Sequence, residues 1–316
     1  MLTRRRYLQL TAATFAAAAG SGARVFAQFT GEITRHAIPS TGEELPIVGL
    51  GSSASFRRLA DDGDSEAIRA VFEALLEGGG TVFDTAPSYG SAEAVAGRVV
   101  GEMNARDSVF WATKLNVAGF GGGRADSEAA WAQVERSFER YGTEPIDLIQ
   151  VHNIADMQTQ FAILRELKEA GRARYIGMTT TFKPQYEAFE QYLRNEPLDF
   201  IGIDYAVDNT SAEERVFPIC QDRGIAVMVY MPFGRTRLWD RVEGHDVPAW
   251  AGEFGASTWG QFFIKFAASH PAVTVVTPAT SRPHHMVDNL GAAYGRLPND
   301  EERRRMIEFI EGLPEA

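Results

Sequence analysis

The sequence holds one cysteine, Cys220, and this scarcity excludes an internal disulfide and any metal cluster built on several cysteines. It also lacks an excess of basic residues, because 31 lysines and arginines stand against 42 acidic residues, for a formal net charge of −11. A chain this acidic, with no basic stripe, is a poor candidate for binding nucleic acid. Cys220 ends the apolar run that begins at Val216, so we expect it to be a small, buried packing residue.

Three further absences narrow the class of protein. The dinucleotide-binding pattern Gly-x-Gly-x-x-Gly is missing, because the stretch from Gly49 to Ala54 lacks the third glycine and the cluster from Gly119 to Gly123 has the wrong spacing. His284 and His285 have no third ligand at a useful spacing, so we predict no metal site. A Gly-x-Ser-x-Gly elbow is also missing, which argues against a hydrolase.

The first 27 residues differ from the rest of the chain. The basic run Arg4-Arg5-Arg6 precedes an alanine-rich stretch, residues 11–19, and the segment ends in Val25-Phe26-Ala27. This order is typical of a signal peptide, and residues 3–8 resemble a twin-arginine export signal. The apolar stretch is too short for a comfortable membrane span. We predict that the twin-arginine machinery exports the protein to the periplasm and that residues 1–27 are removed; an uncleaved anchor or a disordered basic tail is the alternative.

Residues 28–316 show no linker and repeat one pattern, in which a strand-like apolar run is followed by a helix-like stretch. Eight such units predict an α/β fold, a single-domain (β/α)8 TIM barrel, rather than an open doubly wound sheet. A short β-hairpin around residues 33–35 and 45–47 should precede the barrel. Ser211 followed by Glu214 predicts a capping box at the start of one helix. The strand-like runs lie near residues 46–51, 81–84, 108–114, 146–152, 174–179, 199–205, 225–231 and 273–277.

Polar residues stand at the ends of three successive strand-like runs. Asp84 ends the second run, and Tyr89 follows five residues later. Lys114 ends the third run and His152 the fourth. Each has an ordinary structural explanation when taken alone. Because the C-terminal ends of barrel strands meet at one mouth, the four together predict an active site there. A lysine and an aspartate that end buried strands also need each other as partners.

These motifs resemble the aldo/keto reductase superfamily, over nearly all of residues 33–312. The resemblance rests on RHAIPSTGEELPIVGLG (35–51), DTAPSYG (84–90), WATKL (111–115), DLIQVHN (147–153) and TPATSRP (277–283). It implies a catalytic set of Tyr89, Asp84, Lys114 and His152. Tyr89 would exchange a proton with the substrate oxygen, and Lys114 would lower the pKa of that phenol from its ordinary value of about 10. Asp84 would hold Lys114 in place, and His152 would orient the substrate carbonyl.

The resemblance also implies a nicotinamide cofactor bound along the barrel mouth. Tyr230 matches the tyrosine that stacks on the nicotinamide ring, and Thr179-Thr180 stand where Ser-Asn usually holds the carboxamide. A usual glutamine is replaced by Gly202 and a usual arginine by His285, and these changes weaken the case for tight binding of NADP. NAD is therefore also possible, and Arg282 favours NADP. The residues expected around the ribose, the 2′-phosphate and the adenine are Thr280, Arg282, Asp288 and Asn289.

The function expected from this resemblance is an NAD(P)-dependent oxidoreductase that interconverts a small aldehyde or ketone and its alcohol. A catalytically idle, exported barrel with a binding or regulatory role is the alternative. The long connection from Phe233 to Gly255 is either a lid over the site or an insertion without a specific role. Ser53 stands where many relatives have tryptophan, which predicts a roomier or more polar pocket. The mature protein should have no stable membrane span.

Overall fold

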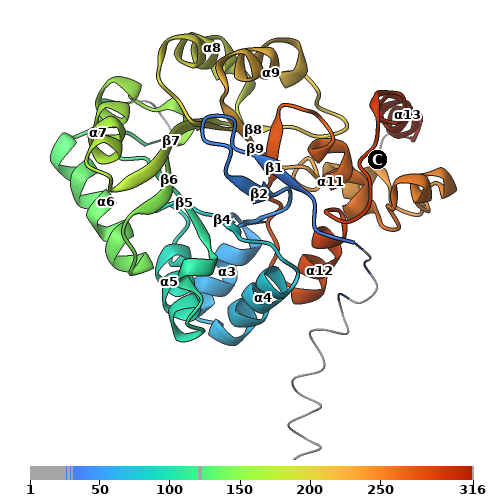
Figure 1. Ribbon diagram of the computed structural model, residues 1–316, viewed down its shortest axis with the longest axis horizontal. Coiled ribbons are helices and arrows are strands. Elements are labelled where there is room, and N and C mark those ends of the chain that lie inside the picture. Colours follow the sequence, from blue (N-terminus) through green and yellow to red (C-terminus); the bar gives the residue numbers. More distant parts are fainter. Residues whose placement is uncertain (1–25, 27–28, 30, 120–122, 315–316) are drawn as a thin grey trace, which may run out of the picture.

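A computed structural model of the chain describes residues 26, 29, 31–119 and 123–314. Apart from Phe26, the predicted signal segment lies outside the described residues. Eight parallel strands form one sheet in the order β10-β9-β8-β7-β6-β5-β4-β3. The sheet curls back on itself, because Val48 forms a parallel bridge with Val276 and Gly51 forms one with Ala279. The predicted (β/α)8 barrel is confirmed, and Figure 1 shows the helices arranged around its strands.

The strands and helices alternate along the chain, as the repeating pattern predicts. The barrel strands are β3 (Leu50–Gly51), β4 (Val82–Asp84), β5 (Phe110–Leu115), β6 (Ile146–Val151), β7 (Ala173–Thr180), β8 (Phe200–Asp204), β9 (Ala226–Tyr230) and β10 (Val273–Val276). The helices are α3 (Ser55–Asp62), α4 (Ser65–Glu77), α5 (Ala92–Glu102), α6 (Ser127–Tyr141), α7 (Met157–Glu169), α8 (Tyr186–Asn195), α9 (Ala212–Arg223), α10 (Arg237–Arg241), α11 (Trp259–Ala268), α12 (Pro283–Gly291) and α13 (Asp300–Glu311).

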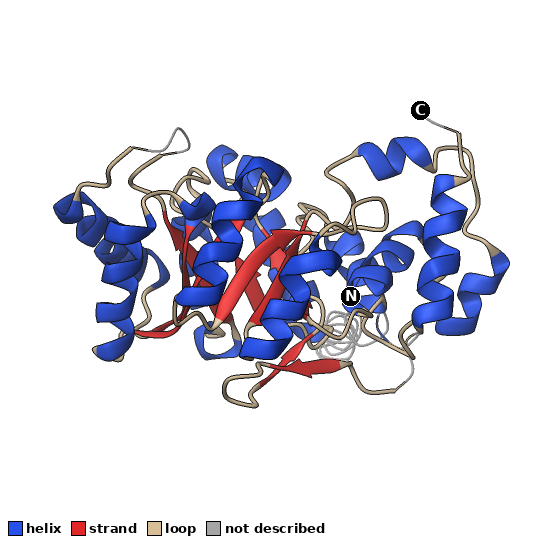
Figure 2. Ribbon diagram, turned by 90° about the horizontal axis from the view of Figure 1, so that it is seen from above, coloured by secondary structure: helices blue, strands red, loops and turns tan. Residues whose placement is uncertain are grey.

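The predicted hairpin precedes the barrel and closes its N-terminal end. Strands β1 (Arg35–Ala37) and β2 (Glu44–Pro46) pair antiparallel, and Figure 2 shows them beneath the barrel strands. Ile38 and Leu45, which flank the hairpin turn, pack in the same buried cluster as Phe110 and Phe200 from inside the barrel. Burial of these apolar side chains stabilises the hairpin against the barrel. This end of the barrel is therefore sealed by packed side chains.

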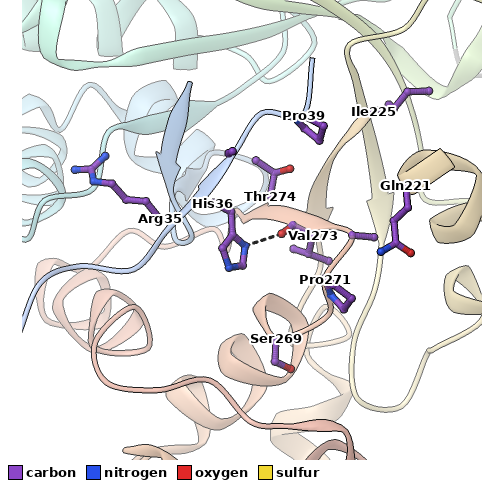
Figure 3. A pocket seen from close by; sticks show the side chains of 11 residues that line it. Arg35, His36, Pro39, Gln221, Ile225, Ser269, Pro271, Val273 and Thr274 are labelled. Carbon is purple, nitrogen blue, oxygen red and sulfur yellow. Dashed lines mark hydrogen bonds between the residues drawn. The ribbon is translucent and has the colours of Figure 1, made fainter. Parts of the chain in front are cut away.

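A small cavity of about 320 Å³ lies between the hairpin and the barrel at this sealed end. His36 Nδ1 lies 2.7 Å from the Val273 carbonyl oxygen and donates to it, as the dashed line in Figure 3 shows. This bond ties β1 to β10. The predicted catalytic residues line a different cavity, at the opposite ends of the strands.

The barrel interior changes from apolar to polar along the strands. Near the sealed end, the inward-facing residues are apolar and include Phe110, Tyr175 and Met228. Farther along the same strands, the inward-facing residues are Lys114 on β5 and Tyr230 on β9, as expected from the two-residue period of a strand. The apolar layer thus closes the bottom of the barrel interior, and the polar side chains of Lys114 and Tyr230 lie nearer its open end.

Two local predictions have opposite outcomes. Cys220 is fully buried on α9, which confirms the packing role, and burial raises the pKa of its thiol. The capping box at Ser211 is wrong, because Ser211 has helical backbone angles and its hydroxyl donates instead to Asn209 Oδ1 at 3.0 Å. A complete capping box occurs at the start of α13, between Asn299 and Glu302. In the described part of the chain, no helix combines the length and apolar character needed to cross a membrane.

Candidate active site

A cavity of about 1160 Å³ opens at the C-terminal ends of the barrel strands. Its walls hold every site residue predicted from the sequence except Thr180 and Arg282. A cavity of this size has room for more than a small carbonyl compound. The predicted residues that line it are Asp84, Tyr89, Lys114, His152, Thr179, Tyr230, Thr280, Asp288 and Asn289.

Asp84 and Lys114 form a buried ion pair at the base of this cavity. Lys114 Nζ donates to both carboxylate oxygens of Asp84, at 2.8 and 2.7 Å, and to the Thr85 carbonyl oxygen at 2.8 Å. The Lys114 side chain is only 1% exposed and the Asp84 side chain 5%. Burial raises the pKa of the Asp84 carboxyl, whereas the charge and hydrogen bonds of Lys114 lower it. The two bonds to Asp84 fix the position of the lysine ammonium.

Tyr89 follows β4 in the loop that leads to α5, and its ring lies beside this ammonium. Lys114 Nζ is 5.6 Å from the centroid of the Tyr89 ring. Burial raises the pKa of the Tyr89 phenol, and the charge of Lys114 acts in the opposite direction. The lysine therefore lowers this pKa, as the sequence predicts, but burial has the larger effect, so the net shift is upward. A raised pKa keeps the phenol protonated and able to donate.

His152 stands next to Tyr89 at the end of β6. The two rings meet edge to face, with centroids 5.8 Å apart. Burial, and secondarily the charge of Lys114, lowers the pKa of His152 to about 3. The imidazole is therefore neutral near pH 7 and can donate one hydrogen bond without carrying charge. Its neighbour Asn153 has a left-handed backbone, with φ of 56°, and also lines the cavity.

Tyr230 ends β9 and reaches across the barrel to the ion pair. Its hydroxyl donates to Asp84 Oδ1 at 3.2 Å and accepts from Gln150 Nε2 at 3.1 Å. The space for the ring exists because residue 202 is glycine: a Cβ there would lie 2.6 Å from the Tyr230 hydroxyl oxygen. The sequence identifies Tyr230 only as a stacking residue. Its contacts with Asp84, Gln150 and Gly202 join different strands and are visible only in the fold.

Thr179 and Thr180 do not form a pair at the cavity. Thr179 lines it, and its hydroxyl accepts from the Asn153 backbone N–H at 3.1 Å. Thr180 points away and donates to Gln185 Oε1 at 2.6 Å. The next cavity-lining residue on this segment is Thr181. Alternation along the strand gives this pattern, and it is a signal that the sequence does carry.

The residues expected near the adenosine come from the segment after β10 and from α12. Thr280 lines the cavity, and its hydroxyl accepts from the Arg282 backbone N–H at 3.2 Å. Asp288 accepts from the Thr258 hydroxyl and from Gln261 Nε2, at 2.9 Å each, so it joins α12 to α11. The Arg282 side chain is exposed and does not line the cavity, whereas His285 does.

The long connection after β9 forms one wall of the cavity. It contains α10 and the short helix η4 (Ala249–Phe254). Phe233 and Trp239 line the cavity, with ring centroids 5.1 Å apart, and Trp239 remains 40% exposed. This segment therefore contributes aromatic surface to the mouth.

Several polar residues that the sequence did not assign to this site also line the cavity, Ser52, Arg57 and Arg235 among them. Ser52 follows β3, Arg57 lies on α3 and Arg235 lies in the loop after β9. The Ser52 hydroxyl is buried and has no hydrogen-bond partner in the described part of the protein. Their position after strand ends is the one signal that could have identified them.

Comparisons with known proteins agree with this geometry. A profile described as "Aldo/keto reductase family" matches residues 48–307. The curated protein "Aldo-keto reductase YhdN" of Bacillus subtilis is 30% identical over 201 residues, which cover 61% of this chain and 60% of that protein. An aldo-keto reductase from Klebsiella pneumoniae, solved in complex with NADPH, has the same fold, with a TM-score of 0.72 at 22% identity, over 90% of this chain and 98% of that one.

A second solved structure, aldo-keto reductase AKR11C1 from Bacillus halodurans in its holo form, gives a TM-score of 0.70 at 21% identity. The alignment covers 90% of this chain and 98% of that one. At these identities the two structures establish the fold, and the profile match over most of the chain establishes the family. The chain belongs to the aldo/keto reductase family of oxidoreductases.

Proposed function

We propose that this protein reduces a small aldehyde or ketone to its alcohol, and catalyses the reverse oxidation, with NADP(H) as cofactor. The observation that carries the proposal is the position of Tyr89. Its ring lines the cavity and has two functional neighbours. The centroid of the Tyr89 ring is 5.8 Å from the centroid of the His152 ring and 5.6 Å from Lys114 Nζ. A proton donor, a neutral hydrogen-bond donor and a fixed positive charge thus face the same space.

The proposed roles follow from this arrangement. The nicotinamide, when bound, supplies or accepts the hydride at the carbonyl carbon. Tyr89 gives its hydroxyl proton to the carbonyl oxygen as charge develops there. Lys114 stabilises the phenolate that remains, and Asp84 keeps the ammonium in place. The neutral His152 orients the carbonyl by donating a hydrogen bond.

The cavity fits a dinucleotide cofactor in size and in the chemistry of its walls. Its volume of about 1160 Å³ exceeds that of most sites for small ligands. Tyr230 offers an aromatic ring near Tyr89, and Thr280 and Asn289 offer polar groups at the α12 end. We assign NADP rather than NAD because the Arg282 guanidinium stands at the start of α12, next to the other residues expected around the adenosine.

The test is NADPH-dependent reduction of a panel of aldehydes by the purified protein, followed at 340 nm, with Tyr89→Phe as the variant. We expect turnover by the wild type, loss of turnover in Tyr89→Phe, and saturable NADPH binding in both, measured by fluorescence. Tyr192→Phe on α8 removes the same hydroxyl away from the cavity and serves as the matched control. Binding of NADPH without turnover of any aldehyde would instead favour an idle barrel.

We also propose that residues 1–27 direct export of the folded protein. Support comes from the order of basic, apolar and small residues in that segment. Fractionation of bacteria that express the full chain should find the protein in the periplasm. In a strain that lacks the twin-arginine translocase, or with Arg4-Arg5-Arg6 changed to lysines, we expect it to remain in the cytoplasm. Periplasmic protein in both cases would contradict this route.

A further inference from the structure

We infer that the preferred substrate of this site is a carbonyl compound that carries an anionic group, such as a carboxylate, bound by Arg57 and Arg235. The inference rests on the proposed function, because it assigns the anion to the substrate of the same cavity. The two arginines are far apart in the sequence, on α3 and in the loop after β9, and both line the cavity.

Neither arginine pairs with a carboxylate that lines the cavity, because the partner of Arg57, Asp61, is not among the lining residues. Lys114 is neutralised by its ion pair with Asp84. The other lining carboxylate, Asp288, is bound by Thr258 and Gln261. The chain as a whole carries a formal charge of −11 and would repel an anion in solution. Among the residues that line the cavity, Arg57, Lys114 and Arg235 outnumber Asp84 and Asp288 by one charge, three against two, so the sign is reversed locally.

Arg235 has a left-handed backbone conformation, which is uncommon for a residue other than glycine. Its φ is 63°, in the left-handed region that glycine adopts without strain. Strain of this kind is concentrated at binding and catalytic sites. Its side chain is exposed and forms no hydrogen bond or ion pair within the described residues. Arg235 and Tyr89 line the same cavity, and the charge of Arg235 is a minor cause that lowers the pKa of the Tyr89 phenol.

Arg57 is attached to the loop that carries Tyr89. Its Nε donates to Asp61 Oδ2 at 3.3 Å, and Asp61 Oδ1 accepts from the Ser91 backbone N–H at 2.8 Å. Ser91 lies two residues after Tyr89. The contact uses only Nε, so both Nη groups of Arg57 remain without partners among the described residues. Exposed pairs such as Arg57–Asp61 contribute little to stability, so this arrangement is better explained by orientation of the guanidinium.

Ser52 adds a third donor, on the buried wall of the same cavity. Its residue is 1% exposed and its hydroxyl has no partner in the described structure, which is costly for a buried polar group. A ligand oxygen in the cavity would satisfy it. Because the substrate carbonyl must come within hydrogen-bond reach of Tyr89, groups placed around Tyr89 face the substrate. The phosphates of the cofactor are the competing anions, and the experiment must separate the two.

The experiment compares 4-carboxybenzaldehyde with its uncharged methyl ester, methyl 4-formylbenzoate, as substrates with NADPH. We expect the wild type to have a kcat/KM about tenfold or more higher for the acid, as charge-assisted hydrogen bonds give. Arg57→Gln and Arg235→Gln should each remove much of this preference through KM, and the double variant should remove it entirely. The ester kcat/KM should fall by a clearly smaller factor than the acid kcat/KM, and the NADPH Kd should change less than about threefold. Arg304→Gln, an exposed arginine on α13 outside the cavity, is the control.

Two results would overturn the inference. One is a wild type that shows no preference for the acid. The other is an Arg235→Gln variant that loses NADPH affinity and both activities equally, which would assign the arginine to the cofactor phosphates. Calorimetric binding of 4-carboxybenzyl alcohol and of its methyl ester separates this inference from the proposed function. Arginine-dependent binding of the acid without turnover of any aldehyde would support the anion site and contradict the reductase.

Discussion

The ring of Tyr230 occupies the space that a side chain on Gly202 would fill. A Cβ on Gly202 would lie 2.6 Å from both Cζ and the hydroxyl oxygen of Tyr230. The family resemblance suggests only that Gly202 replaces a glutamine that would help to hold the cofactor. In the structure, the glycine lets Tyr230 reach Asp84, so the two residues form one feature of the site.

Gly202→Ala should therefore displace the Tyr230 ring and break its hydrogen bond to Asp84. We expect unfolding free energy to fall by about 1–3 kcal/mol, the usual cost of overpacking a core. Urea denaturation followed by tryptophan fluorescence measures this change. In a Tyr230→Ala background the same substitution should cost almost nothing, since the ring is gone. Equal costs in the two backgrounds would show that the two positions are independent.

Asp84→Asn should strongly destabilise the protein, because it leaves the Lys114 ammonium buried without a counter-charge. Removal of one partner of a buried pair typically costs about 3–5 kcal/mol. Urea denaturation checks the magnitude. The double variant Asp84→Asn/Lys114→Met should regain part of the lost stability while remaining inactive. A double variant as unstable as the single one would mean that the charge imbalance is not the cause.

His152 should make the protein less stable as pH falls from about 6.5 toward 3. Its pKa in the folded state is lowered to about 3, chiefly by burial. An unfolded histidine has a pKa of about 6.5, so in this window the unfolded chain binds a proton that the folded chain does not. Stability therefore rises with pH across it. His152→Gln should show a shallower dependence between pH 7 and pH 4 in chemical denaturation, whereas identical slopes would contradict the burial of a neutral imidazole.

Cys220 should be unreactive toward a thiol reagent such as DTNB while the protein is folded. It is fully buried, so the reagent cannot reach it. Burial also raises the pKa of its thiol, so little of the reactive thiolate forms. One equivalent should react once the protein is unfolded in guanidinium. Rapid reaction of the native protein would show that α9 opens more readily than its packing implies.

The sequence predicts features that depend on local order along the chain. Asp84, Lys114 and His152 could be placed at the mouth because each ends an apolar, strand-like run, and such ends meet in a barrel. Features that depend on neighbouring strands could not be placed. The role of Gly202 becomes visible only when Tyr230 is seen to lie over it, and the net pKa of Tyr89 depends on burial that spacing does not reveal.

Two local details have physical causes. Thr179 lines the cavity and Thr180 does not, because strand alternation sends their side chains to opposite faces of β7. Ser211 has the spacing of a capping box, but its hydroxyl finds a nearer partner in Asn209. Competing local hydrogen bonds of this kind are common for serine and are not encoded in spacing alone.

The β1–β2 hairpin has a consequence for the order of events at the site. Because the hairpin and the apolar layer above it seal one end of the barrel, the cavity opens only at the other end within the described structure. Two molecules that bind in such a cavity enter and leave from the same side. If one of them lies beneath the other, it has to arrive first and depart last, so a floor far from the chemistry would set the order of binding and release.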